Sequence, residues 1–312
     1  LHIDLETYSS ISIRDAGLWK YLLSPDFEIL LFAYSVDDNP VQIIDLAQGE
    51  VVPEWIISAL HDPAYIKHAH NAAFEYGCLS RYFGQMEPSH WRCSMFHALY
   101  CGYTASLESV GKALGLPEDK QKLNTGKALI RYFCTPCKPT KSNGGRTRNL
   151  PQHDMEKWNL FKEYCLQDVV AEKDIENRLS SFPVPDFVQK QWETDLRINS
   201  RGVSVDMPFV NGALVIGDTV KSELTTEATA ITQLNNPNSV KQLAEWLDSR
   251  VDTDVTSVNK AVVADLMSED NTPEVQRMLE IRQELGKTST KKYDAIKTCV
   301  CADSRVRGLL QF

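Results

Sequence analysis

Two prolines in the segment "SSFPVPDF" (residues 180–187) divide the chain into halves with different sequence patterns. Before them, β-rich runs such as "EILLFAYSV" (28–36) alternate with segments of helical spacing. After them nearly every segment has helical spacing, with "GVSVD" (202–206) as a short predicted strand. Because proline ends a helix, we expect a domain boundary here. The chain is therefore predicted to form an α/β domain over 1–182 and a mainly helical region over 187–312.

Four further segments carry clear element signals. Pro53 suits the start of a helix over 53–60, and "NAAFEYGCLSRYF" (71–83) has the apolar spacing of a helix. The longest helical pattern runs from about Asp154 to Leu179. Between Cys137 and Gln152 the chain is polar, basic and rich in turn formers, which predicts an exposed loop.

Composition limits the class of protein. The 312 residues suffice for two domains, and 43% hydrophobic with 24% charged residues is typical of a soluble globular protein. No apolar run approaches the roughly 20 residues that span a bilayer, and no signal peptide is visible. The eight cysteines have no framework spacing, which favours reduced thiols in a cytosolic protein.

Charge is distributed unevenly along the chain. The net charge is -9, yet residues 112–148 contain nine Lys or Arg and two acids. Residues 277–307 contain eight basic and four acidic side chains. Such segregation can place basic surfaces on an acidic protein, although a charge run is usually only a solvated face.

The opening segment "HIDLETYSS" (2–10) carries Asp4 and Glu6 two residues apart, so both side chains point to the same side of a strand. Two carboxylates at this spacing repel each other unless the strand is a solvated edge or a cation lies between them. Glu75 and Asp168 are further candidates, and Tyr164 lies four residues before Asp168, on the same helical face. Four carboxylates from three elements, with a phenol beside the last, would hold two Mg²⁺ or Mn²⁺ ions.

This pattern resembles the 3′→5′ exonuclease superfamily with four acidic residues, in the subclass that has a tyrosine in its third motif. The first motif, Asp-x-Glu, matches at Asp4 and Glu6. The second matches "NAAFE", with Glu75 where aspartate is usual, and the third, Tyr-x-x-x-Asp, matches at Tyr164 and Asp168. Each motif is weak alone, but their order along the chain makes the set specific.

The second half of the chain resembles family A DNA polymerases, above all those of bacteriophages and prophages. "SVKQLAEWL" and "MLEIRQELGKTSTKKYDAI" are similar to their thumb helices, and "RINSRGVSVD" to the segment that joins exonuclease domain and thumb. The resemblance implies a ribonuclease H-like domain, with a mixed sheet flanked by helices, followed by a thumb-like region. It also implies a fragment that stops before the palm and fingers and does not polymerise.

The resemblance assigns a role to each acidic residue. Asp4, Glu6 and Asp168 would hold the first ion, with Asp4 bridging to the second, and Glu75 would bind the second ion through water. Tyr164 and Glu6 would orient the attacking water toward the terminal phosphorus, as two-metal phosphodiester cleavage requires. Glutamate is one methylene longer than aspartate, so the carboxylate of Glu75 departs from the usual position of this ligand by about a bond length.

The resemblance also implies DNA contacts. Thr7, Asn71 and Phe74 are expected at the 3′ end of a single strand, where Phe74 either stacks on the terminal nucleotide or packs as core. A basic, hydroxyl-rich segment matches thumb residues that touch the duplex backbone, and its expected contacts are Lys287, Thr288, Thr290 and Lys291. We expect a monomer that needs no membrane, in the cytoplasm of a bacterial or phage-infected cell.

Alternatives remain open at this stage. Glu75, together with Cys93 where many relatives carry an acid, also fits a catalytically silent domain that serves as a scaffold. The metal site alone does not separate DNA from RNA as the substrate. Cys134 and Cys137 have the spacing of half a zinc site. His68 and His70 are interpreted as ordinary core or surface histidines, because oxygen ligands already complete the predicted metal site.

Overall fold

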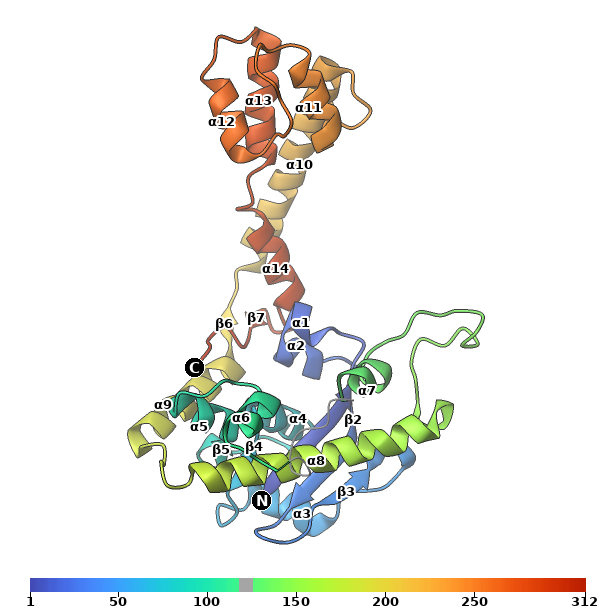
Figure 1. The fold of residues 1–312 in the computed structure, drawn as a ribbon, viewed down its shortest axis with the longest axis vertical. Helices are drawn as coiled ribbons and strands as arrows, with labels where there is room; N and C mark the ends of the chain where they lie inside the picture. Colours follow the sequence, from blue (N-terminus) through green and yellow to red (C-terminus); the bar gives the residue numbers. More distant parts are fainter. Residues whose placement is uncertain (118–125) are drawn as a thin grey trace. The chain divides into compact units, whose positions relative to one another are not determined.

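The computed structural model describes residues 1–117 and 126–312 and divides the chain into two compact units, drawn in Figure 1. The first unit contains Leu1–Ser204 and Cys299–Phe312, and the second contains Val205–Thr298. The helix that follows the two prolines therefore lies in the first unit with the sheet. The assignment of residues 1–182 to an exonuclease domain and of 187–312 to a thumb stays a prediction.

The main sheet of the first unit is mixed and five-stranded, with its strands in the order β3-β2-β1-β4-β5. Its strands are β1 (His2–Tyr8), β2 (Glu28–Ser35), β3 (Gln42–Asp45), β4 (Lys67–Ala69) and β5 (Trp91–Cys93). Strand β1 pairs antiparallel with β2 and parallel with β4, and β4 pairs parallel with β5. Strand β1 is thus the central strand of the sheet. Its apolar side chains are buried on one face of the sheet, and its polar side chains lie on the other face, which a long helix covers.

Helices cover both faces of this sheet. In chain order they are α1 (Ile13–Ala16), α2 (Leu18–Leu22), α3 (Glu54–His61), α4 (Ala73–Phe83), α5 (Ser94–Tyr100), α6 (Leu107–Ala113), α7 (Gly126–Phe133), α8 (Met155–Leu179) and α9 (Asp186–Arg201). Among the described residues, short 3₁₀ turns also lie between these helices: η1 (Leu46–Gln48), η2 (Pro88–His90) and η4 (Pro151–His153).

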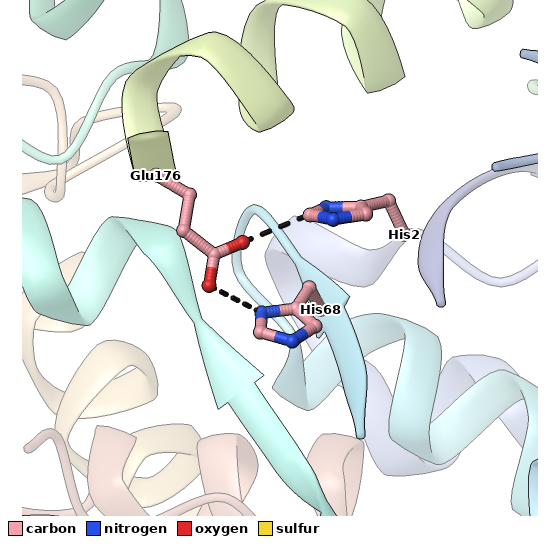
Figure 2. A group of neighbouring side chains, drawn as sticks. All are labelled: His2, His68 and Glu176. Atoms are coloured by element: carbon pink, nitrogen blue, oxygen red, sulfur yellow. Dashed lines mark ion pairs between the residues drawn. The ribbon is translucent and has the colours of Figure 1, made fainter. Parts of the chain in front are cut away.

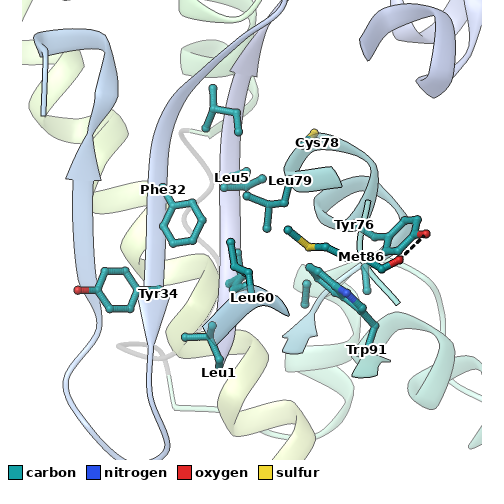
Figure 3. Close-up of a cluster of buried hydrophobic side chains, with 14 of the residues drawn as sticks. Leu1, Leu5, Phe32, Tyr34, Leu60, Tyr76, Cys78, Leu79, Met86 and Trp91 are labelled. Atoms are coloured by element: carbon teal, nitrogen blue, oxygen red, sulfur yellow. Dashed lines mark hydrogen bonds between the residues drawn. The ribbon is translucent and has the colours of Figure 1, made fainter. Parts of the chain in front are cut away.

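Two hydrophobic clusters attach the helices to opposite faces of the sheet. Ile3 and Leu5 of β1 and Phe32 of β2 pack against Leu60 of α3 and Leu79 of α4, and Figure 3 shows this cluster. Phe133 of α7 and the aromatic residues of α8 pack on the other face against Leu31 and Ala33 of β2. The result is a three-layer arrangement, as expected for a mixed sheet whose two faces are both apolar.

Helix α8 confirms the prediction made for residues 154–179. Asp154 is its N-cap, and the Asp154 carboxylate accepts a hydrogen bond from the backbone N–H of Lys157. Its buried residues recur every three or four positions, so a single face of the helix meets the sheet. Figure 1 shows α8 lying across the sheet, and the Cys165 thiol of α8 lies 3.4 Å from Oδ2 of Asp4 on β1.

The second unit is helical throughout its described elements. These are α10 (Met207–Thr232), α11 (Val240–Asp248), α12 (Lys260–Met267), α13 (Pro273–Leu285) and α14 (Lys291–Cys299). Leu243 and Leu247 of α11 meet Leu279 and Ile281 of α13 in its core. Residues 273–300, one of the segments with helical spacing in the sequence, form two helices, because Gly286 caps α13 after Leu285.

A small ladder closes the first unit. Strand β6 (Val203–Ser204) pairs antiparallel with β7 (Arg305–Val306), so the last residues of the chain return to the first unit. The predicted fold class, a mixed α/β sheet flanked by helices followed by a mainly helical region, is confirmed. Within the described ranges, the search for a helix long and apolar enough to cross a bilayer finds none.

Candidate active site

A cleft of about 660 Å³ in the first unit contains all five residues that the sequence motifs single out. Asp4 and Glu6 reach it from β1, Glu75 from α4, and Tyr164 and Asp168 from α8. They are separated by up to 164 positions in the sequence, so only the fold brings them together.

Strand alternation places the first two acids. Ile3 and Leu5 enter the core on one face of the sheet, so Asp4 and Glu6 project from the other, toward α8. The Cys165 thiol of α8 lies 3.4 Å from Asp4 Oδ2, which fixes how closely strand and helix approach. The two carboxylates therefore lie between a buried strand and a buried helix rather than on a solvated edge.

One turn of α8 places Tyr164 beside Asp168. Tyr164 is buried, with its ring stacked on that of Phe161 at a centroid distance of 6.2 Å. Gly126, at the start of α7, permits this position, because a Cβ added there would lie 2.0 Å from Cε2 of Tyr164. Burial raises the pKa of the Tyr164 hydroxyl, and the neighbouring carboxylates, Asp168 first, raise it further. The phenol is therefore neutral and able to donate a hydrogen bond.

Glu75 lies in the first turn of α4 and is only 3% exposed. Its Oε2 atom is buried, and no hydrogen-bond partner for that oxygen is found among the described residues. Burial raises the pKa of Glu75 well above its usual range, and the charges of Asp4 and Glu6 raise it further. A buried carboxyl with an unsatisfied oxygen is an expensive feature unless something positive binds it.

Two thiols at the acidic cluster were not anticipated from the sequence. The Cys134 thiol lies 3.7 Å from Glu6 Oε2, and Cys165 donates toward Asp4. Burial raises the pKa of both thiols, and the neighbouring carboxylates raise it further. Both cysteines are therefore neutral and act as weak hydrogen-bond donors to the acids. Their contacts join residues more than 120 positions apart, which no local pattern indicates.

The donor set of the cleft fits hard divalent cations. Its ionisable oxygens come from four acids and two phenols, Tyr164 and Tyr21, and Mg²⁺ and Mn²⁺ prefer the carboxylate oxygens of such a set. The Oε2 atom of Glu75 has no hydrogen-bond partner among the described residues, and the pKa of the Glu75 carboxyl is raised. Both features fit a site whose negative charges are neutralised by a bound cation.

The three residues that were expected to contact the 3′ end of a DNA strand also border this cleft: Thr7, Asn71 and Phe74. The Thr7 hydroxyl lies 2.6 Å from the Tyr21 hydroxyl, and Asn71 is exposed with a φ of 70°, a conformation that asparagine tolerates. Phe74 is half-buried and packs against the core, with its ring 6.5 Å from that of Tyr21. Phe74 thus combines core packing with a surface on the cleft.

The basic residues expected at a duplex lie in the second unit. Lys287, Thr288, Thr290 and Lys291 occupy the connection between α13 and the start of α14, and all four are exposed. Lys287, Thr290 and Lys291 border a separate cleft of about 750 Å³ against α10. Lys287 forms an ion pair with Glu284, 2.5 Å away.

The remaining residues of interest lie elsewhere. Cys93 is buried at the end of β5, where its sulfur accepts from the Phe96 N–H at 3.4 Å, and it lines a different cleft. His70 bonds to the Ser94 hydroxyl and to a backbone carbonyl, each at 3.0 Å. In the parts of the chain that the structure describes, Cys134 and Cys137 belong to no cluster of three metal-ligating groups, whereas His68 does.

Comparisons with known proteins relate the chain to polymerases. No family model matches it. It is 48% identical over 313 residues to the DNA polymerase of Bacillus phage SP02, a match that covers 100% of this chain and 48% of that protein. The chain thus spans about half the length of the curated relative it matches.

Solved structures give a fold-level likeness. The POL domain of Pol1 from M. smegmatis, in complex with DNA primer-template and dNTP, is 16% identical with a TM-score of 0.51. That match covers 96% of this chain and 51% of the other. The apo form of a nuclease matches with a TM-score of 0.39 at 16% identity, over 63% of this chain and 78% of the other.

Proposed function

Because this chain is, along its whole length, a homologue of a phage DNA polymerase, we propose that its first unit is a metal-dependent 3′→5′ exonuclease. The substrate is the single-stranded 3′ end of DNA, and the products are nucleoside 5′-monophosphates. In the intact polymerase this activity removes mismatched primer ends.

A single observation carries the proposal. Five residues chosen from three short motifs, on β1, α4 and α8, border one cleft. An acidic cleft repels the phosphate backbone of DNA unless cations neutralise it, so the cluster suits phosphodiester chemistry only together with divalent metal ions. Binding alone would favour basic residues at this position.

The residues divide into those that would hold cations and those that would direct water. Asp4, Glu6 and Asp168 would hold one Mg²⁺ or Mn²⁺ ion, with Asp4 shared and Glu75 on the side of a second. Such a pair supplies an activated water and stabilises the leaving oxygen. The neutral Tyr164 hydroxyl, beside Asp168, is suited to position the attacking water by donating to it.

Other residues of the cleft would hold the substrate. Phe74 offers a ring face to the terminal base, and Asn71 and Thr7 offer polar groups to its sugar and phosphate. In the second unit, the exposed segment around Lys287 and Lys291 would contact the backbone of the duplex, independently of its sequence.

The test is digestion of a 5′-labelled single-stranded oligonucleotide with Mg²⁺ or Mn²⁺. We expect stepwise shortening from the 3′ end, abolished by EDTA. Asp4→Ala and Asp168→Ala should each lower the rate by more than about 100-fold, equivalent to about 2.7 kcal/mol of barrier. Asp38→Ala, an exposed acid outside the cleft, is the matched control and should leave the rate unchanged.

A catalytically silent domain acting as a scaffold is the alternative outcome, and Glu75→Asp separates the two. If the wild-type chain is inactive with both metals and Glu75→Asp restores digestion, the site has been silenced. If the wild type is active and Glu75→Asp changes the rate by only a few fold, the glutamate is a working variant. An active Asp4→Ala chain contradicts the exonuclease proposal altogether.

A further inference from the structure

A second polar cluster lies outside the acidic cleft, where β1 begins and α8 nears its end. It consists of His2 on β1, His68 on β4, and Glu172 and Glu176 on α8. His2 and His68 are register partners on neighbouring strands, and their rings stack at a centroid distance of 4.8 Å. Figure 2 shows both imidazoles turned toward the carboxylate of Glu176.

The potential ligand atoms of this cluster are close together. His2 Nδ1 lies 2.6 Å from Glu172 Oε2 and 3.5 Å from Glu176 Oε2, and His68 Nδ1 lies 2.5 Å from Glu176 Oε1. One ligand atom each from His2, His68 and Glu176 fit within 4.8 Å of one another. A four-coordinate zinc ion, with bonds of about 2.0–2.1 Å, holds its ligand atoms about 3.3 Å apart. Small side-chain rotations that widen the contacts of 2.5 and 2.6 Å would therefore fit the group around an ion.

The charges of the cluster call for a cation. Glu172 and Glu176 are one helical turn apart, a spacing at which like charges repel. Their side chains are only 3% and 26% exposed, so water screens the repulsion poorly. The Oε1 atom of Glu172 is buried and, among the described residues, has no hydrogen-bond partner. The two carboxylates together carry two negative charges, which one divalent ion balances fully.

The donor set differs from that of the acidic cleft. Imidazole nitrogen suits zinc and its neighbours in the transition series, whereas oxygen-only sites suit magnesium and manganese. A pair of histidines with a pair of carboxylates is a nitrogen–oxygen set of the kind that zinc accepts. A cleft of about 380 Å³, lined by His68, Glu176 and His97 among others, gives a path from solvent.

We propose that His2, His68, Glu172 and Glu176 form a zinc site that is separate from the carboxylate cleft. The ion would join β1 and β4 to the C-terminal half of α8, the helix that also carries Tyr164 and Asp168. The role is structural. It neutralises two buried acids and fixes the helix against the strands.

The experiment is zinc binding by the full chain in excess Mg²⁺, which occupies oxygen-only sites. Calorimetry should detect a single tight zinc ion, and cobalt substituted for zinc should give the visible absorption of a tetrahedral site. His68→Asn and Glu176→Gln should each weaken zinc binding by more than about 100-fold, a loss of about 2.7 kcal/mol. His90→Asn, a histidine outside the cluster, and Asp168→Asn, in the carboxylate cleft, should bind zinc as the wild type does.

Several results would overturn the site. These are no tight zinc binding by the wild type, unchanged binding by His68→Asn, or loss of binding in Asp168→Asn. Melting curves in EDTA show whether a variant still folds. X-ray absorption of the zinc-loaded wild type needs no variant at all: imidazole ligands support the site, and oxygen ligands alone exclude it. None of these readouts depends on nuclease activity, so the two proposals can fail separately.

Discussion

At the scale of single residues, burial of Glu75 in the acidic cleft costs free energy of folding. It is buried, one of its oxygens lacks a partner among the described residues, and the charges of Asp4 and Glu6 oppose its ionisation. In the metal-free protein its pKa is therefore raised, which ties folding stability to pH.

The sign of this linkage gives a prediction for Glu75→Gln. A carboxyl whose pKa is raised by folding contributes its full stability below its usual value of about 4.3 and loses it as pH rises through the folded value. In EDTA, Glu75→Gln should therefore melt at a higher temperature than the wild type, by a margin that grows from acidic to alkaline pH. Melting followed by circular dichroism measures this.

Two controls accompany the Glu75 measurement. Glu54→Gln, an exposed glutamate of α3, should leave the melting temperature unchanged at every pH. Saturating Mn²⁺ should reverse the order, because the wild type gains more from cation binding than the variant does. If the wild type melts at a higher temperature than Glu75→Gln in EDTA at alkaline pH, burial and charge repulsion do not raise the pKa of Glu75 and this explanation is wrong.

At the scale of residues, the sequence motifs indicated which side chains to look for together. Asp4, Glu6, Glu75, Tyr164 and Asp168 were singled out from order and spacing, and they do border one cleft. Their roles as ligands stay a prediction. The thiols of Cys134 and Cys165 and the cluster around His68 were missed, because their partners lie on other elements and follow no local pattern.

At the scale of elements, the contact between α7 and α8 controls the position of Tyr164. Gly126 leaves space for the tyrosine ring, and a methyl group there would lie 2.0 Å from Cε2 of Tyr164. The ring cannot retreat easily, because it packs on Phe161 in the core. Overpacking of this kind costs about 1–3 kcal/mol and shifts the side chain.

Gly126→Ala should therefore lower the exonuclease rate by at least about tenfold, or about 1.4 kcal/mol of barrier. The matched control is Gly111→Ala in α6, where an added Cβ would meet Leu116 at an ordinary 3.5 Å. Digestion rates of both variants, at equal folded fraction, test the role of the α7 contact. Equal rates for Gly126→Ala and the wild type would show that the Tyr164 position does not matter for cleavage.

Helices and strands with a strong local sequence signal were predicted accurately, and those with a weak signal were not. The capping residue and the regular apolar spacing of α8 defined it from Asp154 to Leu179 almost to the residue. Strand β5 is only three residues long, too short for alternation to show, and it was not predicted. Residues 273–300 have helical spacing in the sequence but form two helices, α13 and α14, because Gly286 caps α13 after Leu285.

At the scale of the whole molecule, the two units present side chains of opposite charge. The first presents a cleft lined by carboxylates, and the second presents exposed lysines between α13 and α14. The acidic net charge of the chain therefore does not forbid contact with DNA, because the basic residues are gathered locally.

Replacing Lys287, Lys291 and Lys292 together by glutamine should weaken duplex binding equally for all DNA sequences. The plot of log K, where K is the binding constant, against log salt concentration has a negative slope. Each lost phosphate contact should reduce the magnitude of that slope by about 0.9. Fluorescence anisotropy over a range of salt concentrations measures this. Lys241→Gln, an exposed lysine of α11, is the control and should keep the wild-type slope. A triple variant with an unchanged slope would remove the segment from the DNA contact.

The β6–β7 ladder has a mechanical consequence. Ser204 pairs with Arg305, so the chain leaves for the second unit and returns from it at the same end of two short antiparallel strands. A force that pulls the second unit away from the first would open this ladder one rung at a time, the weakest loading geometry for paired strands. The bond from the Arg305 guanidinium to the Ser204 hydroxyl, at 3.2 Å, lies at the loaded end. The bonds of Arg305 and Arg307 to the carbonyls of Arg201 and Ser200 lie behind the ladder and would be loaded after it.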